Sequence, residues 1–312
     1  MTVKLIDEVQ AELYFWDLWN AAFKKHGFDT FCTLLRVDGL HDAGWDPLEE
    51  SAQAFDDYNW HLTAKDSALS EKSAWRIGLL MYCQAVEMSA IHAMLGNLLR
   101  ILEGKPYRLN PLGPLGRVDK KRMFKWYPPS AKTKWKKLRD MAAGVGQQQL
   151  VLMIDQMFSD DVRNSFSHSD YVITEKHFRW TEGGLAQQLP LEDVSALITN
   201  SFTFIGRFMH VHERALTDSA TMGRRYHKWP QYEVLELLKS EGKLSGFRVH
   251  FSNGASARFH RGPDGVDCMN VIINGNGTIN FMCGQLDLLE PRWKVDGREV
   301  DFGSENSRDQ FE

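Results

Sequence analysis

The 312-residue sequence predicts an α+β protein, a helical bundle with a small hairpin followed by a small antiparallel β domain. Two observations support this class. Apolar residues recur at helical spacing through most of the first two-thirds of the chain. Beyond Pro230, short apolar runs alternate with turns that contain Gly and Asn, which is typical of strands. We expect a helical domain over residues 1–218, with its core at about 70–215, a β domain over 231–303 and a loose tail over 304–312.

The expected helices follow from apolar spacing and capping residues. Residues 6–25 carry aromatic and aliphatic side chains at helical spacing. The clearest helix starts at Ser70, an N-cap residue, and ends before Gly104. It is apolar over most of its circumference, and at 1.5 Å per residue it would be about 50 Å long. A stretch rich in Pro, residues 104–135, follows it. Further helices are expected at 147–158, 160–168, 191–215 and 231–240.

The expected strands are short. Two of them come before a turn at Gly183 and Gly184 and the closing helix of the bundle, and the others follow residue 240. A domain boundary is expected at about 218–230. The strands are expected at 171–174, 177–180, 247–251, 255–259, 271–273, 279–283, 293–295 and 300–302.

Composition limits the classes of partner. The net charge of −4 gives no global signal for nucleic acid, so any basic surface must be local. The four cysteines lack the short spacing of zinc or redox motifs, which favours reduced thiols in a cytoplasm. The N-terminus has acidic residues where a secretory signal needs an apolar run. We expect a soluble cytoplasmic protein with no membrane partner and no cofactor.

The most informative motif is RNSFSHSDY, residues 163–171. On a helix that advances 100° per residue, Val162 and Phe166 share a face toward a core. Arg163 and His168 then lie at the two edges of a polar arc, roughly 140° apart. Asn164, one turn before His168, is placed to orient its ring. One helix cannot easily point both edges at one atom, whereas two copies related by a two-fold axis can.

The residue types of this arc suit chemistry on a phosphate. The guanidinium of Arg163 offers a fixed set of donors for phosphate oxygens, and His168 can take and return a proton near neutral pH. Without a metal-ligand cluster nearby in the sequence, the natural reaction is RNA cleavage by its own 2′-OH. The alternative is structural, because Arg and His near a helix end often only satisfy carbonyl groups and complement the helix dipole.

The motif resembles the signature of HEPN domains (higher eukaryotes and prokaryotes nucleotide-binding), with Arg and His separated by four residues. The resemblance covers about residues 70–215. It implies a helical core, a homodimer and, in many members, metal-independent endoribonuclease activity in antiphage or toxin–antitoxin systems, with a protein partner or antitoxin. It implies that Arg163 and His168 are the catalytic pair and that Asn164, Ser167, Asp170 and Tyr171 support them.

A local basic and aromatic patch lies just before the motif, within residues 117–139. Such a mixture is typical of surfaces that bind single-stranded nucleic acid. The alternative is a solvated loop whose aromatic side chains pack into the bundle, and the two readings are equally favoured. The residues expected to bind RNA are Lys120, Lys121, Arg122, Lys125, Trp126, Lys134, Trp135, Lys136 and Lys137.

Glu87 is the other unusual residue, because a carboxylate on so apolar a helix needs a partner. We expect it at the surface, with Arg163 as the alternative partner. His210 and His212 point about 200° apart on a helix, so we do not expect them to share a metal ion.

Two hypotheses follow. In the first, the chain is a dimeric, metal-independent HEPN-type endoribonuclease whose β domain recognises a substrate, trigger or partner. In the second, it is a non-catalytic HEPN-like dimerisation and nucleotide-binding module whose β domain mediates a partner interaction.

Overall fold

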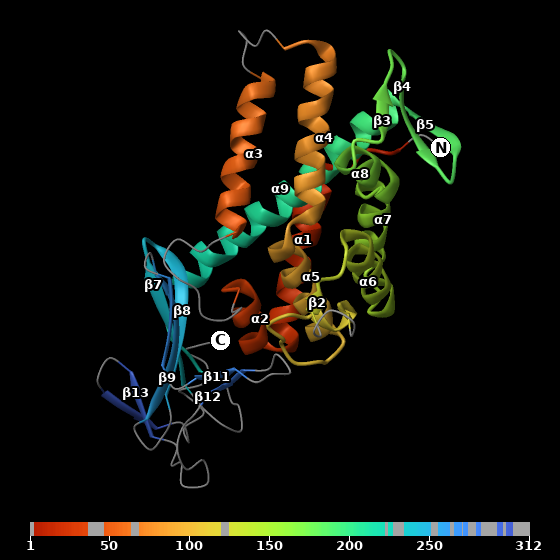
Figure 1. The fold of residues 1–312 in the computed structure, drawn as a ribbon. Coiled ribbons are helices and arrows are strands. Elements are labelled where there is room, and N and C mark those ends of the chain that lie inside the picture. The colour runs from red at the N-terminus through yellow and green to blue at the C-terminus, as the bar shows by residue number, and fades with distance from the viewer. Residues whose placement is uncertain are drawn as a thin grey trace. The chain divides into compact units, whose positions relative to one another are not determined.

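The computed structural model describes residues 3–36, 47–63, 69–119, 125–221, 224–226, 234–250, 255–262, 265–269, 271–273, 279–281, 292–295 and 298–301. It has the expected α+β class (Figure 1). The helices are α1 (Glu8–Lys25), α2 (Gly27–Leu34), α3 (Pro47–Thr63), α4 (Glu71–Glu87), α5 (Ser89–Leu102), the 3-10 helix η1 (Gly113–Leu115), α6 (Ala131–Gly144), α7 (Gln148–Met157), α8 (Asp160–Ser167) and α9 (Leu191–Thr221).

The strands form small antiparallel sheets. A three-stranded sheet has the order β3-β4-β5 and a five-stranded sheet the order β10-β9-β8-β7-β6, and the other pairs are β1-β2, β11-β12 and β13-β14. The strands are β1 (Arg117–Asp119), β2 (Lys125–Tyr127), β3 (Tyr171–Ile173), β4 (His177–Glu182), β5 (Leu185–Pro190), β6 (Arg224–Tyr226), β7 (Val234–Ser240), β8 (Lys243–His250), β9 (Ser256–Gly262), β10 (Gly265–Met269), β11 (Val271–Ile273), β12 (Ile279–Phe281), β13 (Arg292–Val295) and β14 (Arg298–Asp301).

The chain divides into two units. The first comprises Met1–Trp19, Asp46–Glu103 and Leu112–Val211, and the second comprises Asn20–Trp45, Gly104–Pro111 and His212–Glu312. Two segments that the sequence placed in the helical domain, 20–45 and 104–111, therefore group with the C-terminal strands. The range expected as a linker, 218–230, contains the end of α9, which runs to Thr221, and the strand β6 (Arg224–Tyr226). The expected tail at 304–312 lies outside the described residues and stays a prediction.

Aromatic rings from distant segments form the core of the first unit. Phe15 on α1 packs edge-to-face on Phe204 of α9 at 5.1 Å between ring centroids, and Trp135 of α6 packs on the same ring at 5.8 Å. All three side chains are fully buried or nearly so. Edge-to-face aromatic pairs are favourable because the positive ring edge meets the negative face. The packing of Trp135 fixes α6 in the bundle.

The long helix expected over 70–103 is two helices, and this corrects the prediction. Ser70 is the N-cap as expected, since its hydroxyl accepts from the amide of Ser73 at 3.2 Å. The helix breaks at Met88, which has ψ 101°. The carbonyl of Val86 accepts from the indole Nε1 of Trp135 at 2.8 Å, in place of the amide four residues later. A donor from α6 thus replaces the amide of the same helix, and the next helix, α5, starts at Ser89.

Other helices and strands were missed or misassigned. The expected helix at 231–240 is wrong: residues 234–240 form β7, which pairs with β8. Its short apolar run fits either structure, and the neighbouring strand decides. Helices α2, α3 and α6 were not expected. The basic composition of 131–144 concealed α6, although Ser130 caps it by accepting from the amide of Thr133 at 3.3 Å. The helix expected at 191–215 continues to Thr221.

Helices α7 and α8 and the first two strands of the neighbouring sheet were predicted correctly, whereas its third strand, β5, was not expected. Helix α7 covers 148–157, α8 covers 160–167, and β3 and β4 begin at the expected residues. The turn at Gly183 and Gly184 joins β4 to β5, and both residues have positive φ, which glycine adopts without steric cost.

The second unit contains a five-stranded antiparallel sheet with one apolar face. Phe247 and Phe259 lie opposite each other on β8 and β9, and both are buried. A side chain at Gly246 would put its Cβ 2.2 Å from the carbonyl oxygen of Phe259, so the close approach of these strands requires glycine there. The turns that contain Gly and Asn, at 252–254 and 274–277, lie outside the described residues.

The stretch Glu71–Leu102 is long and apolar enough to cross a membrane by length and composition. In the structure 61% of its most apolar 18-residue segment is buried within the protein, as in the core helix of a soluble protein.

Candidate functional site

The motif at 163–171 lies on α8 and the turn after it, and both ends of this helix are capped. Ser159 accepts from the amide of Val162 at 3.4 Å, and Asp160 and Asp161 place negative charge in the first turn. At the other end, the amide of Asp170 donates to the carbonyl of Ser165 and that of Ser169 to Phe166. Ser169 has a φ of 59°. This is a Schellman motif, and it places His168 at the C-cap.

Helix α8 is fixed on α4 by a buried tyrosine. The hydroxyl of Tyr82 donates to the carbonyl of Ser159 at 3.1 Å and accepts from the amide of the same residue at 2.8 Å. Burial raises the pKa of Tyr82 well above its usual range. Val162 is fully buried, as predicted, whereas Phe166, which was expected on the same face, is only half-buried. Arg163 follows at the edge of the contact with α4.

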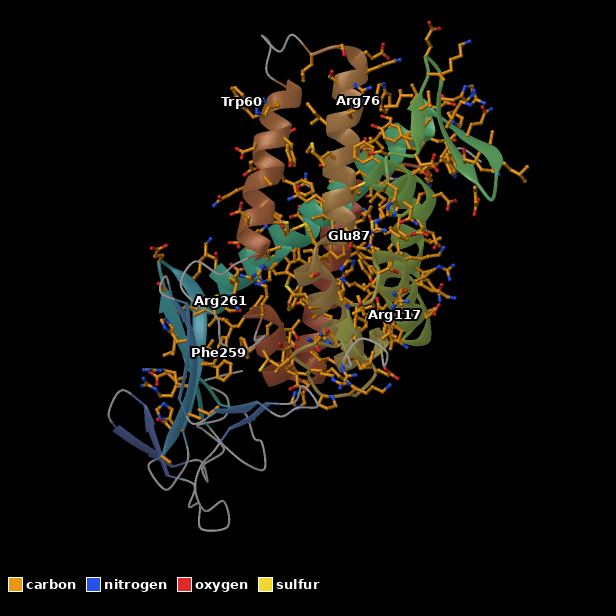
Figure 2. All side chains as sticks on the ribbon, viewed as in Figure 1. Trp60, Arg76, Glu87, Arg117, Phe259 and Arg261 are labelled. Atoms are coloured by element: carbon orange, nitrogen blue, oxygen red, sulfur yellow. The ribbon has the colours of Figure 1, made fainter. Side chains whose placement is uncertain are left out.

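Arg163 is held on both sides. Its Nη2 atom forms an ion pair with Oε1 of Glu87, and its Nη1 donates to Oδ1 of Asn164 at 2.6 Å. The side chain of Arg163 is 21% exposed and that of Glu87 is 37% exposed. The pair therefore lies at the boundary between interior and solvent. The sequence placed Glu87 at the surface and kept Arg163 as the alternative partner, and the structure has the alternative (Figure 2 labels Glu87 on α4).

Lys134 of α6 lies beside this pair. Its Nζ donates to Oγ of Ser89 at 3.4 Å. Burial lowers the pKa of its ammonium group, the carboxylate of Glu87 partly opposes this shift, and the charge of Arg163 adds to it. Two cations and one carboxylate thus share a small, partly buried region. The sequence assigned Lys134 to RNA binding but gave no signal that it lies next to Arg163.

His168 occupies the other edge of the helix and is exposed. Its backbone amide donates to the carbonyl of Asn164 at 2.9 Å. Among the described residues no contact joins its ring to Arg163, in agreement with the wide angle predicted between them. The expected orientation of its ring by Asn164 is not observed, because the carboxamide oxygen of Asn164 binds Arg163 instead.

The remaining supporting residues have different surroundings. The hydroxyl of Ser167 donates to Sγ of Cys83 at 3.8 Å, and burial raises the pKa of that thiol. Asp170 is exposed. The ring of Tyr171 lies between Phe166, at 5.1 Å, and Phe178, at 5.4 Å. Tyr171 therefore packs the hairpin on α8.

The basic patch is only partly described. Lys120, Lys121 and Arg122 lie outside the described residues, and Lys125 and Trp126 belong to β2. Lys136 and Lys137 are exposed on α6.

Trp135 corrects the prediction for this patch. It was expected to stack on RNA, but it is 1% exposed, and its indole donates to the carbonyl of Val86. For this side chain the alternative, packing into the bundle, is right. The amphipathic pattern of 131–144, with Ala131, Trp135, Leu138 and Ala142 on one face, was the available signal.

His210 and His212 have separate surroundings within α9, which continues past them to Thr221. His210 lies 3.6 Å from Oε1 of Glu12, and Nε2 of the buried His212 lies 2.8 Å from the carbonyl oxygen of Leu34. Within the described ranges no group of three His, Cys, Asp or Glu side chains could hold a metal ion.

Models of protein families, curated proteins and solved structures were compared with the chain, and none of them matches it.

Proposed function

We propose that the chain is an endoribonuclease of the HEPN type, which its motif resembles, and that it cleaves RNA without a metal ion at a site shared by two copies. The observation that carries the proposal is the fixed position of Arg163, held by Glu87 and Asn164 with Lys134 beside it. A preorganised cationic site of this kind stabilises the negative charge that develops on a phosphate in the transition state. A cytoplasmic role in antiphage defence or as a toxin belongs to the same proposal.

The chemistry uses groups from both chains. The 2′-oxygen of the ribose attacks the phosphorus atom, and its proton passes to an imidazole that acts as the base. The bond from phosphorus to the 5′-oxygen breaks, and a proton from an acidic group passes to that oxygen. The products are a 2′,3′-cyclic phosphate and a 5′-hydroxyl. Arg163 and Lys134 of one copy bind the phosphate oxygens, while His168 of the other copy faces them.

The test is complementation between two inactive variants. Arg163→Ala and His168→Ala are each expected to be inactive alone. In a mixed dimer, one site has lost both groups and the other keeps Arg163 from one chain and His168 from its partner. Random association of co-expressed variants should therefore restore about a quarter of the wild-type cleavage rate. Activity that stays at the level of the single variants in purified mixed dimers would contradict a shared site.

A second function has its own support. Glu87 already occupies one side of the Arg163 guanidinium, and His168 makes no contact with it among the described residues. These features suit a non-catalytic dimerisation module that binds a nucleotide phosphate. Full cleavage activity in His168→Ala would favour an activity located elsewhere, whereas absence of cleavage by the wild type, with phosphate binding retained, would favour this module.

A further inference from the structure

A pocket of about 260 Å³ lies at the break between α4 and α5 and is partly open to solvent. Leu48 and Ser51 of α3 line it together with residues at the break itself, which are Gln84, Glu87, Met88, Ser89 and Ala90. Helices α3 and α4 run side by side in the first unit (Figure 1). The volume lies below the roughly 300–1,000 Å³ typical of pockets for drug-sized ligands. It suits one planar ring system better than a complete nucleotide.

The charged acceptor of the pocket is the carboxylate of Glu87, and the carboxamide of Gln84 and the hydroxyls of Ser51 and Ser89 can donate as well as accept. The Oε1 atom of Glu87 binds Arg163, while no partner for Oε2 is found in the described part of the chain. Helix α5 has no side-chain cap. The amides of Ser89 and Ala90 in its first turn have no acceptor among the described residues. A carboxylate thus lies next to free amide donors, with the apolar side chains of Leu48 and Met88 around them.

This arrangement matches the edge of guanine. Guanine presents two adjacent donors, N1–H and the N2 amino group, next to one acceptor, the O6 carbonyl. The carboxylate of Glu87 can accept from the donors while an amide of the first turn of α5 donates to O6. Adenine and cytosine each present a single amino donor on this edge, and uracil presents a single N3–H. A phosphate is disfavoured in the pocket itself because Glu87 repels it.

The pocket is connected to both cations of the candidate site. Glu87 contacts Arg163 through its carboxylate, and Ser89 accepts from Lys134. A base bound against Glu87 and Ser89 therefore has its own phosphate within reach of Arg163 and Lys134. We propose that this pocket binds the guanine of the nucleotide next to the cleaved phosphate, which makes the enzyme selective for guanosine in RNA. The inference rests on the proposed ribonuclease activity only in taking the bound guanine to be part of an RNA.

Binding of nucleosides to the full-length protein tests the pocket without any phosphate. Guanosine, adenosine, cytidine and uridine are titrated and followed by NMR or calorimetry. We expect guanosine to bind at least tenfold more tightly than the other three. Ser51→Trp fills the pocket from α3 and should abolish guanosine binding. Gln53→Trp adds the same side chain at an exposed position of that helix and should leave it unchanged. Glu87→Gln, a second variant, should remove the preference for guanosine.

Cleavage of short RNAs that carry a single guanosine or inosine shows whether the pocket binds guanine within an RNA or a free guanine nucleotide. Inosine lacks the N2 amino group, and we expect about a tenfold lower kcat/KM. Selective guanosine binding without any RNA cleavage would assign the pocket to a free guanine nucleotide and overturn the ribonuclease proposal. Cleavage that ignores the base and tolerates Ser51→Trp, with no guanosine binding, would overturn the pocket and leave the ribonuclease intact.

Discussion

The two edges of α8 differ in how firmly they are held. Arg163 is partly buried and bound by Glu87 and Asn164, with Lys134 nearby. His168, five residues later, is exposed at the C-cap. A site that binds phosphate gains from a cation fixed before the substrate arrives, because little reorganisation is then needed. In the proposed shared site, each chain contributes Arg163 as the prepared half, and His168 faces the Arg163 of the other copy.

The largest expected effect is on RNA cleavage, and it is accompanied by a difference in stability between variants of Arg163 and His168. His168→Ala should lower RNA cleavage by about 10²–10⁴-fold, because general acid–base catalysis is lost. Its thermal stability should not change. Arg163→Ala should lower cleavage by a similar factor and also cost up to about 1 kcal/mol of stability, a value kept small because the pair is partly exposed. Cleavage assays with a chelator present and thermal denaturation measure both.

The matched control for that comparison is Arg139→Ala. Arg139 forms a bidentate pair with Asp155 on the exposed side of α6, at 2.6 and 2.9 Å. Its loss should change neither cleavage nor folding detectably. If Arg139→Ala impaired cleavage as strongly as Arg163→Ala, general basic charge rather than the position of Arg163 would explain the activity.

A second, smaller effect concerns the pH dependence of folding, to which the buried His92 contributes. His92 is buried beside Trp135, at 4.6 Å between ring centroids. Burial, with a further contribution from Lys134, lowers its pKa to about 3. The unfolded chain takes up a proton near pH 6.5 while the folded chain does not, so stability falls as pH decreases below that value. Between pH 7 and 5 the wild type should lose about 2 kcal/mol more stability than His92→Leu.

Chemical denaturation at both pH values measures this difference. Gln53→Trp, the exposed control variant described above, serves as the comparison because it changes no titratable group. We therefore expect its loss of stability between the two pH values to equal that of the wild type. An identical slope for His92→Leu and the wild type would mean that His92 is not held neutral by its surroundings.

The smallest expected effect is on the stability of the C-terminal end of α8, next to His168. Ser169 has a φ of 59°, where a side chain is unfavourable, so Ser169→Gly should stabilise the protein by about 1 kcal/mol. Ser167→Gly, within the last turn of α8, should destabilise it by about 0.5–1 kcal/mol. Thermal denaturation shows whether each substitution raises or lowers the stability. Stabilisation by both glycines would show that this helix end does not form the Schellman motif.

The sequence predicted those features that depend on neighbouring residues. Ser70 was recognised as a cap because capping involves residues within one turn. Helix α8 and the hairpin followed from the same local signals. The spacing of 163–168 likewise gave the wide angle between Arg163 and His168, since it follows from helix geometry alone.

Features that depend on distant residues were missed. The break at Met88 arises because Trp135 takes the carbonyl of Val86, 49 residues away in the chain. The strand β7 was mistaken for a helix because its short apolar run has no preference until β8 pairs with it.

What the sequence determined by itself was therefore the helix that begins at Asp160 and ends at the C-cap His168, and the wide separation of Arg163 and His168 around it. The tertiary structure decided which groups surround Arg163. Glu87 lies 76 positions away, and only the packing of α8 on α4 brings the two together. Lys134 arrives on a third helix, held there by the burial of Trp135. Periodicity fixes which way a side chain points, but only packing between helices fixes what it meets.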